Sequence, residues 1–472
     1  MKYFLSNFRY GYLAVGAAAL LVSGCNIGPK YTRPAAPVPP AFRGADDAAV
    51  SSDPKGSLGD QQWSEVFREP ELQALIRTAL ENNFDLRIAA ERILEQQAQV
   101  KITRSQQFPQ ISVGGTGVGA EFPDSLGSDI QSPLTLGSYN LSASWTPDFW
   151  GIYRKQTQAA RDQLLAQTWA QRAVRLSLVQ QVASTYFQLR ELDQQLAIAR
   201  QTEQTRQNSV DLTRTLETGG AAPLSDLRQA EQLLYTATSQ IPQLEQQIQQ
   251  NENGLQLLLG KNPGPVAHTD PNALAPPPEN LPVGLPSQLL ERRPDIQQAE
   301  AQLRAANAQV GVARAQFFPQ LTISASGGLG GSTFANLFNT SGQTVYGYGT
   351  LAQPLFEGGK LRGQLQLSER QKQEMVLDYQ KAIATAFHDV SNALIAVQKQ
   401  RVARVEQQKL VAAAQDATRL ARIRYRGGAT AYLEVLTTDT NLFSAQLNLA
   451  SAQQSEAITL VQLYSALGGG WQ

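Results

Sequence analysis

Two long helical patterns, each followed by a strand pattern, organise this chain of 472 residues. From Pro70 onward apolar residues recur at helical spacing to about residue 102, and residues 109–120 then alternate and carry no charge. The period changes at Pro109, since proline cannot continue a helix. The same change occurs at Pro319, after which residues 319–331 alternate. Each half of the chain is therefore predicted to be a helix that turns into a strand.

The two halves are copies of one unit. The stretch RSQQFPQISV, which begins at Arg104, returns as RAQFFPQLTI, which begins at Arg314, 210 residues later. Aligning residues 80–113 with 290–323 without a gap gives 12 identities in 34 positions, where chance gives roughly 2. We expect a first repeat over residues 66–261, a proline-rich linker over 262–286 and a second repeat over 287–472.

Each repeat is predicted to contain one hairpin of uncharged strands. The strands cover about residues 109–120 and 137–147 in the first repeat, and about 319–331 and 344–355 in the second. Alternation assigns the lipid-facing side of a barrel to Tyr139, Leu141 and Trp145, and its inner side to Asn140, Ser142 and Ser144. With Pro147 and Pro354 as equivalent markers, Tyr346 and Tyr348 are predicted to share the lipid-facing side.

The polar sides of these strands carry Ser, Thr, Asn and Gly rather than charges, which favours a membrane hairpin over the alternative, a soluble sandwich. Strands of about 9 to 12 residues have the length that a tilted transmembrane strand needs. Four strands cannot close a barrel, and open edges are not tolerated in lipid. The chain must therefore oligomerise if it enters a membrane.

The remaining helical stretches are unusually long. No Pro or Gly interrupts residues 152–217, and a second rod covers about 358–426, with glycines only near its start, the last being Gly363. At 1.5 Å per residue each rod is about 100 Å long. Both rods end in a Gly-Gly turn, after which shorter helices are expected over residues 224–259 and 432–467. A cytoskeletal or scaffolding coiled coil is the alternative, but it would need neither a signal sequence nor uncharged hairpins.

The N-terminus reads as a lipoprotein signal. Residues 1–24 combine a positive start, a short apolar run and a small-residue cleavage point before Cys25. Cys25 resembles the acylated cysteine of a bacterial lipobox, and Asn26 after it favours the outer membrane; an ordinary signal peptide with a chance cysteine is the alternative. Residues 25–65 are predicted to form an extended, lipid-anchored tether, because their composition cannot bury a core.

Composition gives no support to catalysis or to nucleic-acid binding. The 40 basic and 40 acidic residues cancel, and one cysteine and two histidines offer neither a disulfide nor a local metal-ligand pair. The glycines of residues 327–331 lie in a predicted strand with no helix after it, so they do not form a nucleotide-binding loop. The sequence predicts no enzyme, no cofactor and no metal site.

Several motifs resemble the outer-membrane-factor family, the TolC-like channels and efflux lipoproteins of tripartite pumps. They are GPKYTRP from Gly28, the stretch GLPSQLLERRPD from Gly284, FFPQL from Phe317 and PLFEGG from Pro354. The resemblance covers essentially the whole mature chain. It implies an α+β membrane protein that forms a homotrimer, in which 12 strands, four from each chain, make one transmembrane β-barrel continued by a long periplasmic α-helical barrel.

The resemblance also implies a function and partners. The chain would be the outer-membrane channel of a tripartite efflux system, lipid-anchored in the bacterial outer membrane with palmitate at Cys25. It would passively conduct drugs or other small molecules from an inner-membrane pump and a periplasmic adaptor to the exterior. A TolC-like exit duct for protein secretion stays open as the alternative.

Residues around the Gly-Gly turns match positions that close TolC-like channels at the periplasmic end. The resemblance makes Asp226, Tyr425 and Glu434 candidate gate residues, with Arg424 and Arg426 as cationic partners. The family often has an acid where this chain has Thr437, and the nearest acid, Asp439, lies about 200° further round the helix. The alternative is that all of these are solvated helix-end charges.

Overall fold

The computed structural model describes residues 27–35, 37–44, 50–51, 56–120, 134–267, 281–331 and 342–471. Cys25 and the predicted signal peptide lie outside the described residues, as do parts of the predicted tether and linker. The chain divides into two compact units, and each draws on both repeats. Unit 1 comprises Met1–Ala35, Arg92–Gln167 and Gln298–Tyr379, and unit 2 comprises Ala36–Glu91, Thr168–Gln297 and Gln380–Gln472.

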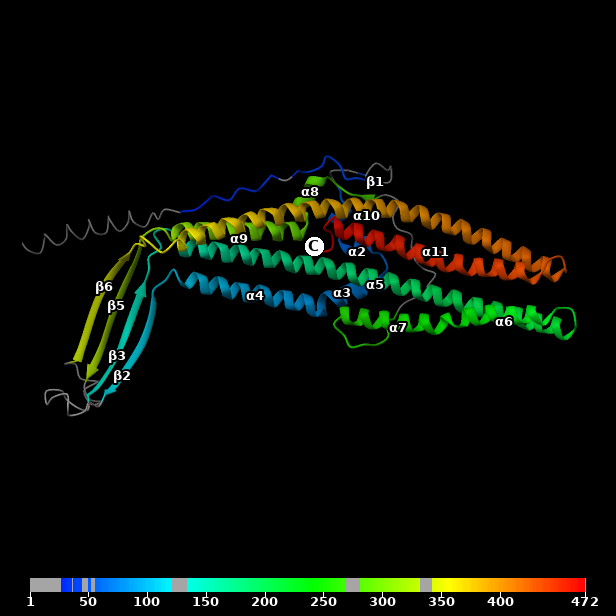
Figure 1. The fold of residues 1–472 in the computed structure, drawn as a ribbon, viewed down its shortest axis with the longest axis horizontal. Helices are drawn as coiled ribbons and strands as arrows, with labels where there is room; N and C mark the ends of the chain where they lie inside the picture. The colour runs from blue at the N-terminus through cyan, green and yellow to red at the C-terminus, as the bar shows by residue number, and fades with distance from the viewer. Residues whose placement is uncertain are drawn as a thin grey trace, which may run out of the picture. The chain divides into compact units, whose positions relative to one another are not determined.

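The described elements follow the same order in both repeats (Figure 1). In the first repeat they are α3 (Pro70–Asn82), α4 (Phe84–Ser105), β2 (Gln110–Ala120), β3 (Leu134–Trp145), α5 (Ile152–Thr218), α6 (Leu224–Thr238) and α7 (Gln240–Leu258). In the second they are α8 (Pro286–Arg292), α9 (Pro294–Ala315), β5 (Gln320–Gly331), β6 (Gln343–Ala352), α10 (Lys360–Arg426) and α11 (Tyr432–Ala466). Short elements complete the fold: β1 (Val50–Ser51), η1 (Leu58–Asp60), α2 (Trp63–Val66) and β4 (Leu281–Pro282).

The two longest helices, α5 and α10, each contain 67 residues and are therefore each about 100 Å long. Within the described residues, no helix is both long enough and apolar enough to cross a bilayer.

The helix that returns after α5 is broken, where the sequence predicts a single helix over 224–259. α6 ends at Thr238 and α7 begins at Gln240. Pro242, in the first turn of α7, has no N–H to donate to residue 238, and its ring would clash with that carbonyl. The return helix of the second repeat lacks such a proline and continues unbroken through the 35 residues of α11.

The turn from helix to strand is fixed by side chains that bond to the backbone. Trp145 Nε1 donates to the carbonyl of Gln107 at 3.1 Å, and Trp150 Nε1 donates to that of Pro319 at 2.5 Å. Trp150 also stacks on Phe318, with ring centroids 5.0 Å apart. The repeated Phe-Pro-Gln motif thus marks a built junction, at which Pro ends the helix and tryptophans satisfy carbonyls that no helix partner reaches.

Four strands form one antiparallel sheet in the order β2-β3-β5-β6. The helices attached to these strands lie side by side in the same order in unit 1. Gln107, just after α4, bonds to Thr157 of α5. The side chain of Lys155 on α5 lies against Gly311 of α9, and Arg314 of α9 pairs with Glu369 of α10. The two hairpins are therefore joined through β3 and β5, and β2 and β6 are the sheet's edges in a single chain.

The register corrects one prediction from the sequence. Directly paired residues of an antiparallel sheet point to the same face. Ser142 pairs with Ser326, and Ser326 pairs with Tyr346; Ser144 is linked through Ser324 to Tyr348 in the same way. Tyr346 and Tyr348 therefore lie on the face of the serines, not on the face of Leu141, and the prediction that they share the lipid-facing side was wrong.

The error came from the proline markers. Ser144 lies opposite Gln110 and three residues before Pro147, whereas its counterpart Ala352 lies opposite Gln320 and two residues before Pro354. Both prolines lie beyond the ladder, so nothing keeps their distance to the strand equal. A difference of one residue moves every side chain to the other face.

With the register corrected, the two faces differ in polarity, although exposed Val118, Tyr346 and Tyr348 lie on the more polar one. One face carries exposed apolar side chains from all four strands: Ile111, Val113, Leu141, Trp145, Ile323, Val345 and Leu351. The other carries hydroxyl and amide groups that bond across strands, such as Ser112 to Ser142 at 2.8 Å and Asn140 Nδ2 to Ser326 Oγ at 3.3 Å. An apolar face that is left exposed, opposite a polar face bonded to itself, is the arrangement expected of a barrel wall in lipid.

Neighbouring residues of β6 allow a matched test of these faces. We expect Val345→Arg to destabilise the inserted assembly by about 2 to 4 kcal/mol near the bilayer midplane, and Tyr346→Arg to cost much less. The pair Leu141→Arg and Ser142→Arg on β3 should behave in the same order. The measurement is the yield of heat-modifiable oligomer in outer-membrane fractions. Equal losses within a pair, or a larger loss for Tyr346→Arg, would contradict the assignment of faces.

Candidate functional site: the Gly-Gly turns and the helices beside them

Both Gly-Gly turns have the same backbone geometry. Gly220 and Gly428 adopt φ values of +76° and +69°, which side chains disfavour. The next residue then donates back into the helix, Ala221 to the carbonyl of Leu216 and Ala429 to that of Arg424, each at 2.8 Å. This pattern ends a helix and satisfies its last carbonyls, so each turn closes a helical hairpin with a defined exit direction.

An apolar cluster joins the two hairpins just beyond these turns. Its buried members come from α5, α6, α10 and α11: Val210, Leu227, Ala230, Leu234, Ala421, Tyr432 and Val435. Tyr425 and Leu436 pack against it while partly buried. The two turns therefore belong to one packed end of the helices in unit 2.

Tyr425 and Asp226, one candidate from each hairpin, lie in this end. The ring of Tyr425 is tilted against that of Tyr432, with centroids 5.1 Å apart. Burial, and after it the negative charge of Asp226, raises the pKa of Tyr425 above its ordinary value. Tyr425 is therefore a neutral phenol and keeps its hydrogen-bond donor.

Glu434 is held by its own hairpin. Arg424 Nη1 donates to Glu434 Oε1 at 2.8 Å, and Thr430 Oγ1 donates to the other carboxylate oxygen. The pair joins the end of α10 to the start of α11 and remains about half exposed on the Arg424 side. Arg426 lies along a groove of α10 and α11 with Arg422. The structure therefore pairs Arg424 with Glu434, and it brings the charge of Asp226 near enough to Tyr425 to raise the pKa of that phenol.

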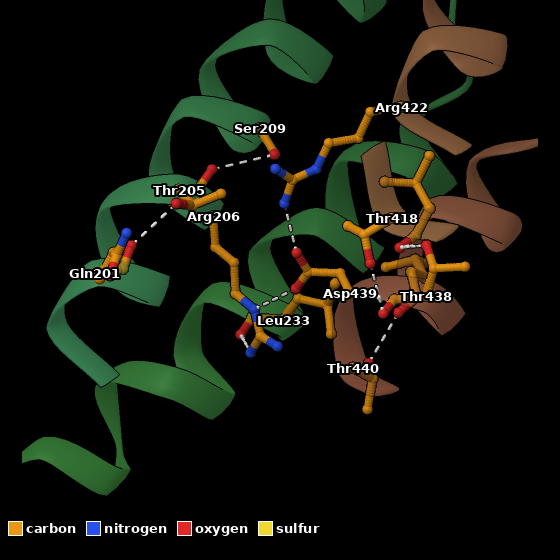
Figure 2. Close-up of polar contacts among 12 residues, drawn as sticks. Gln201, Thr205, Arg206, Ser209, Leu233, Thr418, Arg422, Thr438, Asp439 and Thr440 are labelled. Carbon is orange, nitrogen blue, oxygen red and sulfur yellow. Dashed lines mark hydrogen bonds and ion pairs between the residues drawn. The ribbon is translucent and has the colours of Figure 1, made fainter. Parts of the chain in front are cut away.

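Asp439 holds the most buried charge cluster of this end, and sequence reasoning had set it aside. Arg206 Nε of α5 donates to one oxygen of Asp439 at 2.8 Å, and Arg422 Nη2 of α10 donates to the other at 2.6 Å. Arg206 also donates to the carbonyl of Leu233 on α6 at 2.7 Å, and its guanidinium lies 4.9 Å from the ring centre of Phe443. Figure 2 shows the two arginines reaching Asp439 from different helices.

The Asp439 cluster, consisting of Arg206, Asp439 and Arg422, connects four helices. The side chains of Arg206 and Asp439 are only 3% and 9% exposed. A charge at that depth is stable only when it is paired and hydrogen-bonded, so the cluster fixes the register of α5, α10 and α11. Beside it, Thr418 Oγ1 donates to the carbonyl of Thr438 at 2.9 Å and bonds α10 to α11 a second time (Figure 2).

The sequence contains a signal for this cluster. Arg206 falls in a buried helical stripe with Ala199 and Val210, and Asp439 falls in one with Val435 and Phe443. A charged residue at an apolar position of a long helix indicates a partner of opposite charge on a neighbouring helix. Which helix supplies that partner depends on the packing, which a single sequence does not reveal.

Among the described residues, no three His, Cys, Asp or Glu side chains gather closely enough to hold a metal ion. The polar groups at this end of the helices instead pair with one another.

Comparison with known proteins places the chain in a family. A family model described as "Outer membrane efflux protein" matches residues 75–261 and 285–469, one segment in each repeat. The chain belongs to this family of outer-membrane channels. It is the outer-membrane channel component of a tripartite efflux system, with four strands per chain in a trimeric transmembrane β-barrel and long helices that extend into the periplasm.

Similar proteins match along nearly their whole length. The chain is 34% identical to the Cation efflux system protein CusC of Escherichia coli over 455 residues, which cover 96% of this chain and 97% of the relative. It is 36% identical over 470 residues to the Solvent efflux pump outer membrane protein SrpC of Pseudomonas putida, covering 96% and 97%. The open-state MtrE outer membrane channel of Neisseria gonorrhoeae superimposes with a TM-score of 0.82 at 29% identity, covering 95% of this chain and 99% of that one.

Removing the acid of the Asp439 cluster tests its structural role. Asp439→Asn keeps the shape but leaves Arg206 without a charged partner, and breaking a buried pair in this way costs about 3 to 5 kcal/mol. The matched control is Asp416→Asn, whose pair with Arg419 is more than half exposed on both sides and should contribute under about 1 kcal/mol. Denaturant unfolding of the purified trimer measures both. A loss below about 1 kcal/mol for Asp439→Asn would show that the cluster does not hold these helices.

Proposed function

We propose that three copies of this chain form a passive, lipid-anchored exit duct for small organic molecules, without catalytic activity. An inner-membrane pump and a periplasmic adaptor would deliver substrate to its helical end. Closure of the sheet supports the trimer, because β2 and β6 have open edges in one chain and must pair with another copy in lipid. Cys25 would carry the lipid.

The proposal that the substrates are small organic molecules rests on the residues that line a hollow in unit 1. Residues from α4, α5, α9 and α10 line it, and of these sixteen residues eight are glutamine and only Glu374 is charged. Amide side chains donate and accept hydrogen bonds but attract neither cations nor anions strongly. Such a wall suits neutral or weakly charged solutes that differ in shape.

Some relatives are named for organic substrates, and one is named for cations. Relatives from Pseudomonas putida are named as solvent, toluene and antibiotic efflux proteins, and the Escherichia coli relative as a cation efflux protein. Soft metal ions such as Cu(I) select thiolate and thioether ligands, and this chain has one cysteine and two methionines in total. We therefore place it with the organic-solute channels.

We also propose that the Gly-Gly end is closed at rest. Asp226 and Tyr425 would meet across hairpins, and the pair of Arg424 with Glu434 would hold the tip of the second hairpin. A resting channel that stayed open would leak, so this end needs contacts that are broken on opening. The exposed pair of Arg424 with Glu434 suits that role, because such a pair contributes under about 1 kcal/mol and can be exchanged at little cost.

Deleting the gene tests the proposed function. We expect the minimum inhibitory concentration of several solvents, dyes or antibiotics to fall at least about fourfold, because the duct serves organic solutes. The minimum inhibitory concentrations of copper and silver should change little. Complementation with the wild-type gene should restore resistance, and complementation with Val345→Arg should not. A rise in sensitivity confined to metal ions would contradict the substrate class, and no change for any compound would contradict the efflux role.

The gate is tested by conductance in planar bilayers. The double variant Glu434→Ala with Tyr425→Phe should raise open probability several-fold, because it removes both the acid that holds the second tip and the phenol near Asp226. The control is Asp416→Ala, which removes an exposed acid from α10 whose partner lies on the same helix. If the double variant assembles as a trimer and conducts like the control, these residues do not close the channel.

A further inference from the structure

The first described residues of the chain, 27–35, lie along α9 within unit 1. Tyr31 Oη donates to Glu300 Oε1 at 3.2 Å, and Arg33 donates to the other oxygen of Glu300. Asn307 Nδ2 donates to the carbonyl of Pro29 at 3.1 Å. The segment is thus held by specific polar contacts rather than lying loosely on the surface.

Glu300 is the centre of this attachment. It is only 1% exposed, and Arg304 of the same helix also donates to it, at 2.5 Å. Burial by itself would raise the pKa of Glu300, but the hydrogen bonds from Arg33 and Arg304 outweigh burial and leave the pKa below its ordinary value. The Arg304 guanidinium lies 5.3 Å from the ring centre of Tyr31. Without residues 27–35, Glu300 would lose its bonds to Tyr31 and Arg33, and Arg304 would lose its contact with the ring of Tyr31.

Backbone contact fixes the other end of the segment. Gly28 has φ of +142°, and a Cβ added there would lie 2.8 Å from the Cα of Gly311 on α9. A Cβ at Gly311 would in turn meet the carbonyl oxygen of Ile27 at 3.3 Å. Position 28 therefore needs glycine, a side chain at 311 would be tight, and the chain at residue 28 touches the helix backbone itself.

The contacts run in one direction and at matched spacing. Glu300, Arg304, Asn307 and Gly311 form one stripe of α9, since residues three and four apart share a face. From Glu300 to Gly311 the helix rises about 17 Å, and the extended chain from Arg33 to Gly28 covers about the same length. The segment therefore runs antiparallel to α9, and its N-terminal end points toward the turn into β5.

We propose that residues 28–33 are a clamp that holds the acylated N-terminus beside the last turn of α9, at the foot of the transmembrane sheet. Gly311 lies one turn before the end of α9 at Ala315, and β5 begins at Gln320. Cys25 is the third residue before Gly28, so chain length alone limits the lipid-bearing residue to within about 11 Å of Gly28. This inference rests on the proposed lipidation of Cys25.

The clamp couples two membrane attachments at a fixed distance. A single acyl chain binds a membrane weakly, and two linked attachments reinforce each other only when the linker lets both engage together. Pinning the lipid next to the start of β5 places the acyl chains and the apolar face of the sheet against the same leaflet. A loose tether of about 40 residues would dilute that effect.

A matched pair of insertions tests the geometry. The hexapeptide Gly-Ser-Gly-Ser-Gly-Ser is inserted between Ile27 and Gly28, which lengthens the chain between lipid and clamp, or between Ala35 and Ala36, which leaves that stretch unchanged. Trimer in outer-membrane fractions should fall several-fold for the first insertion and remain near wild type for the second, with palmitate labelling equal in both. Equal trimer yields for the two insertions would overturn the proposal.

Charge removal tests the clamp contacts themselves. Glu300→Gln should release the segment, so that trypsin cleaves after Lys30 and removes the palmitate label about tenfold faster than in wild type, because local opening exposes the chain. The control is Glu369→Gln, whose pair with Arg314 is nearly half exposed on both sides, and its cleavage rate should equal that of wild type. Unchanged cleavage in Glu300→Gln would also overturn the clamp.

The lipid itself is tested separately with Cys25→Ser. Loss of palmitate labelling in this variant, together with the insertion result, supports both the lipid and the clamp. Persistent labelling would refute lipidation at Cys25 and with it the proposed position of the lipid. In the unacylated variant, cleavage after Lys30 is followed by mass spectrometry and should still be faster when Glu300→Gln is added, since residues 28–33 bind α9 through their own contacts.

Discussion

Backbone hydrogen bonding is the constraint on which the rest of this structure depends. In lipid every N–H and C=O of a strand must find a partner, yet one chain supplies a four-stranded sheet with edges at β2 and β6. Only assembly with further copies removes those edges. The helices attached to the strands must then follow the same circular order, and the order seen in unit 1, α4-α5-α9-α10, repeats that of the sheet. A membrane requirement on four strands thus determines how helices of about 100 Å are arranged.

Much of this architecture could be predicted from the sequence because duplication and periodicity carry it. The change of period at Pro109 and Pro319 located the strands, and the absence of Pro and Gly located the rods; the fold class and the family were confirmed. The face of Tyr346 was missed because strand register depends on hydrogen bonding within the ladder, whereas Pro354 lies outside it. The break at Ser239 was missed because one proline, Pro242, was given less weight than a long helical pattern.

The candidate site was predictable only in part, for a different reason. Resemblance to the family pointed to Asp226, Tyr425 and Glu434. In the structure the charge of Asp226 helps to raise the pKa of Tyr425, after burial, and Glu434 is bonded to Arg424. The pairing within the Asp439 cluster could not be predicted, because Asp439 lies 233 and 17 positions from its two arginines in sequence. The packing of three helices brings these residues together. A single sequence shows that a charged residue occupies an apolar stripe, but it does not show which residue pairs with it.

Buried acids held between two arginines recur along these helices, and register explains why. Asp439 of α11 lies between Arg206 of α5 and Arg422 of α10, and Glu456 of α11 lies between Arg401 and Arg404 of α10. The seams of the long helices are rich in alanine and glutamine, so sliding one helix by a turn would replace one weak contact with another similar one. The same slide would strand a buried carboxylate and two guanidinium groups, at a cost of several kcal/mol. These buried charges therefore favour a single register of the packed helices, which seams of alanine and glutamine alone would not select.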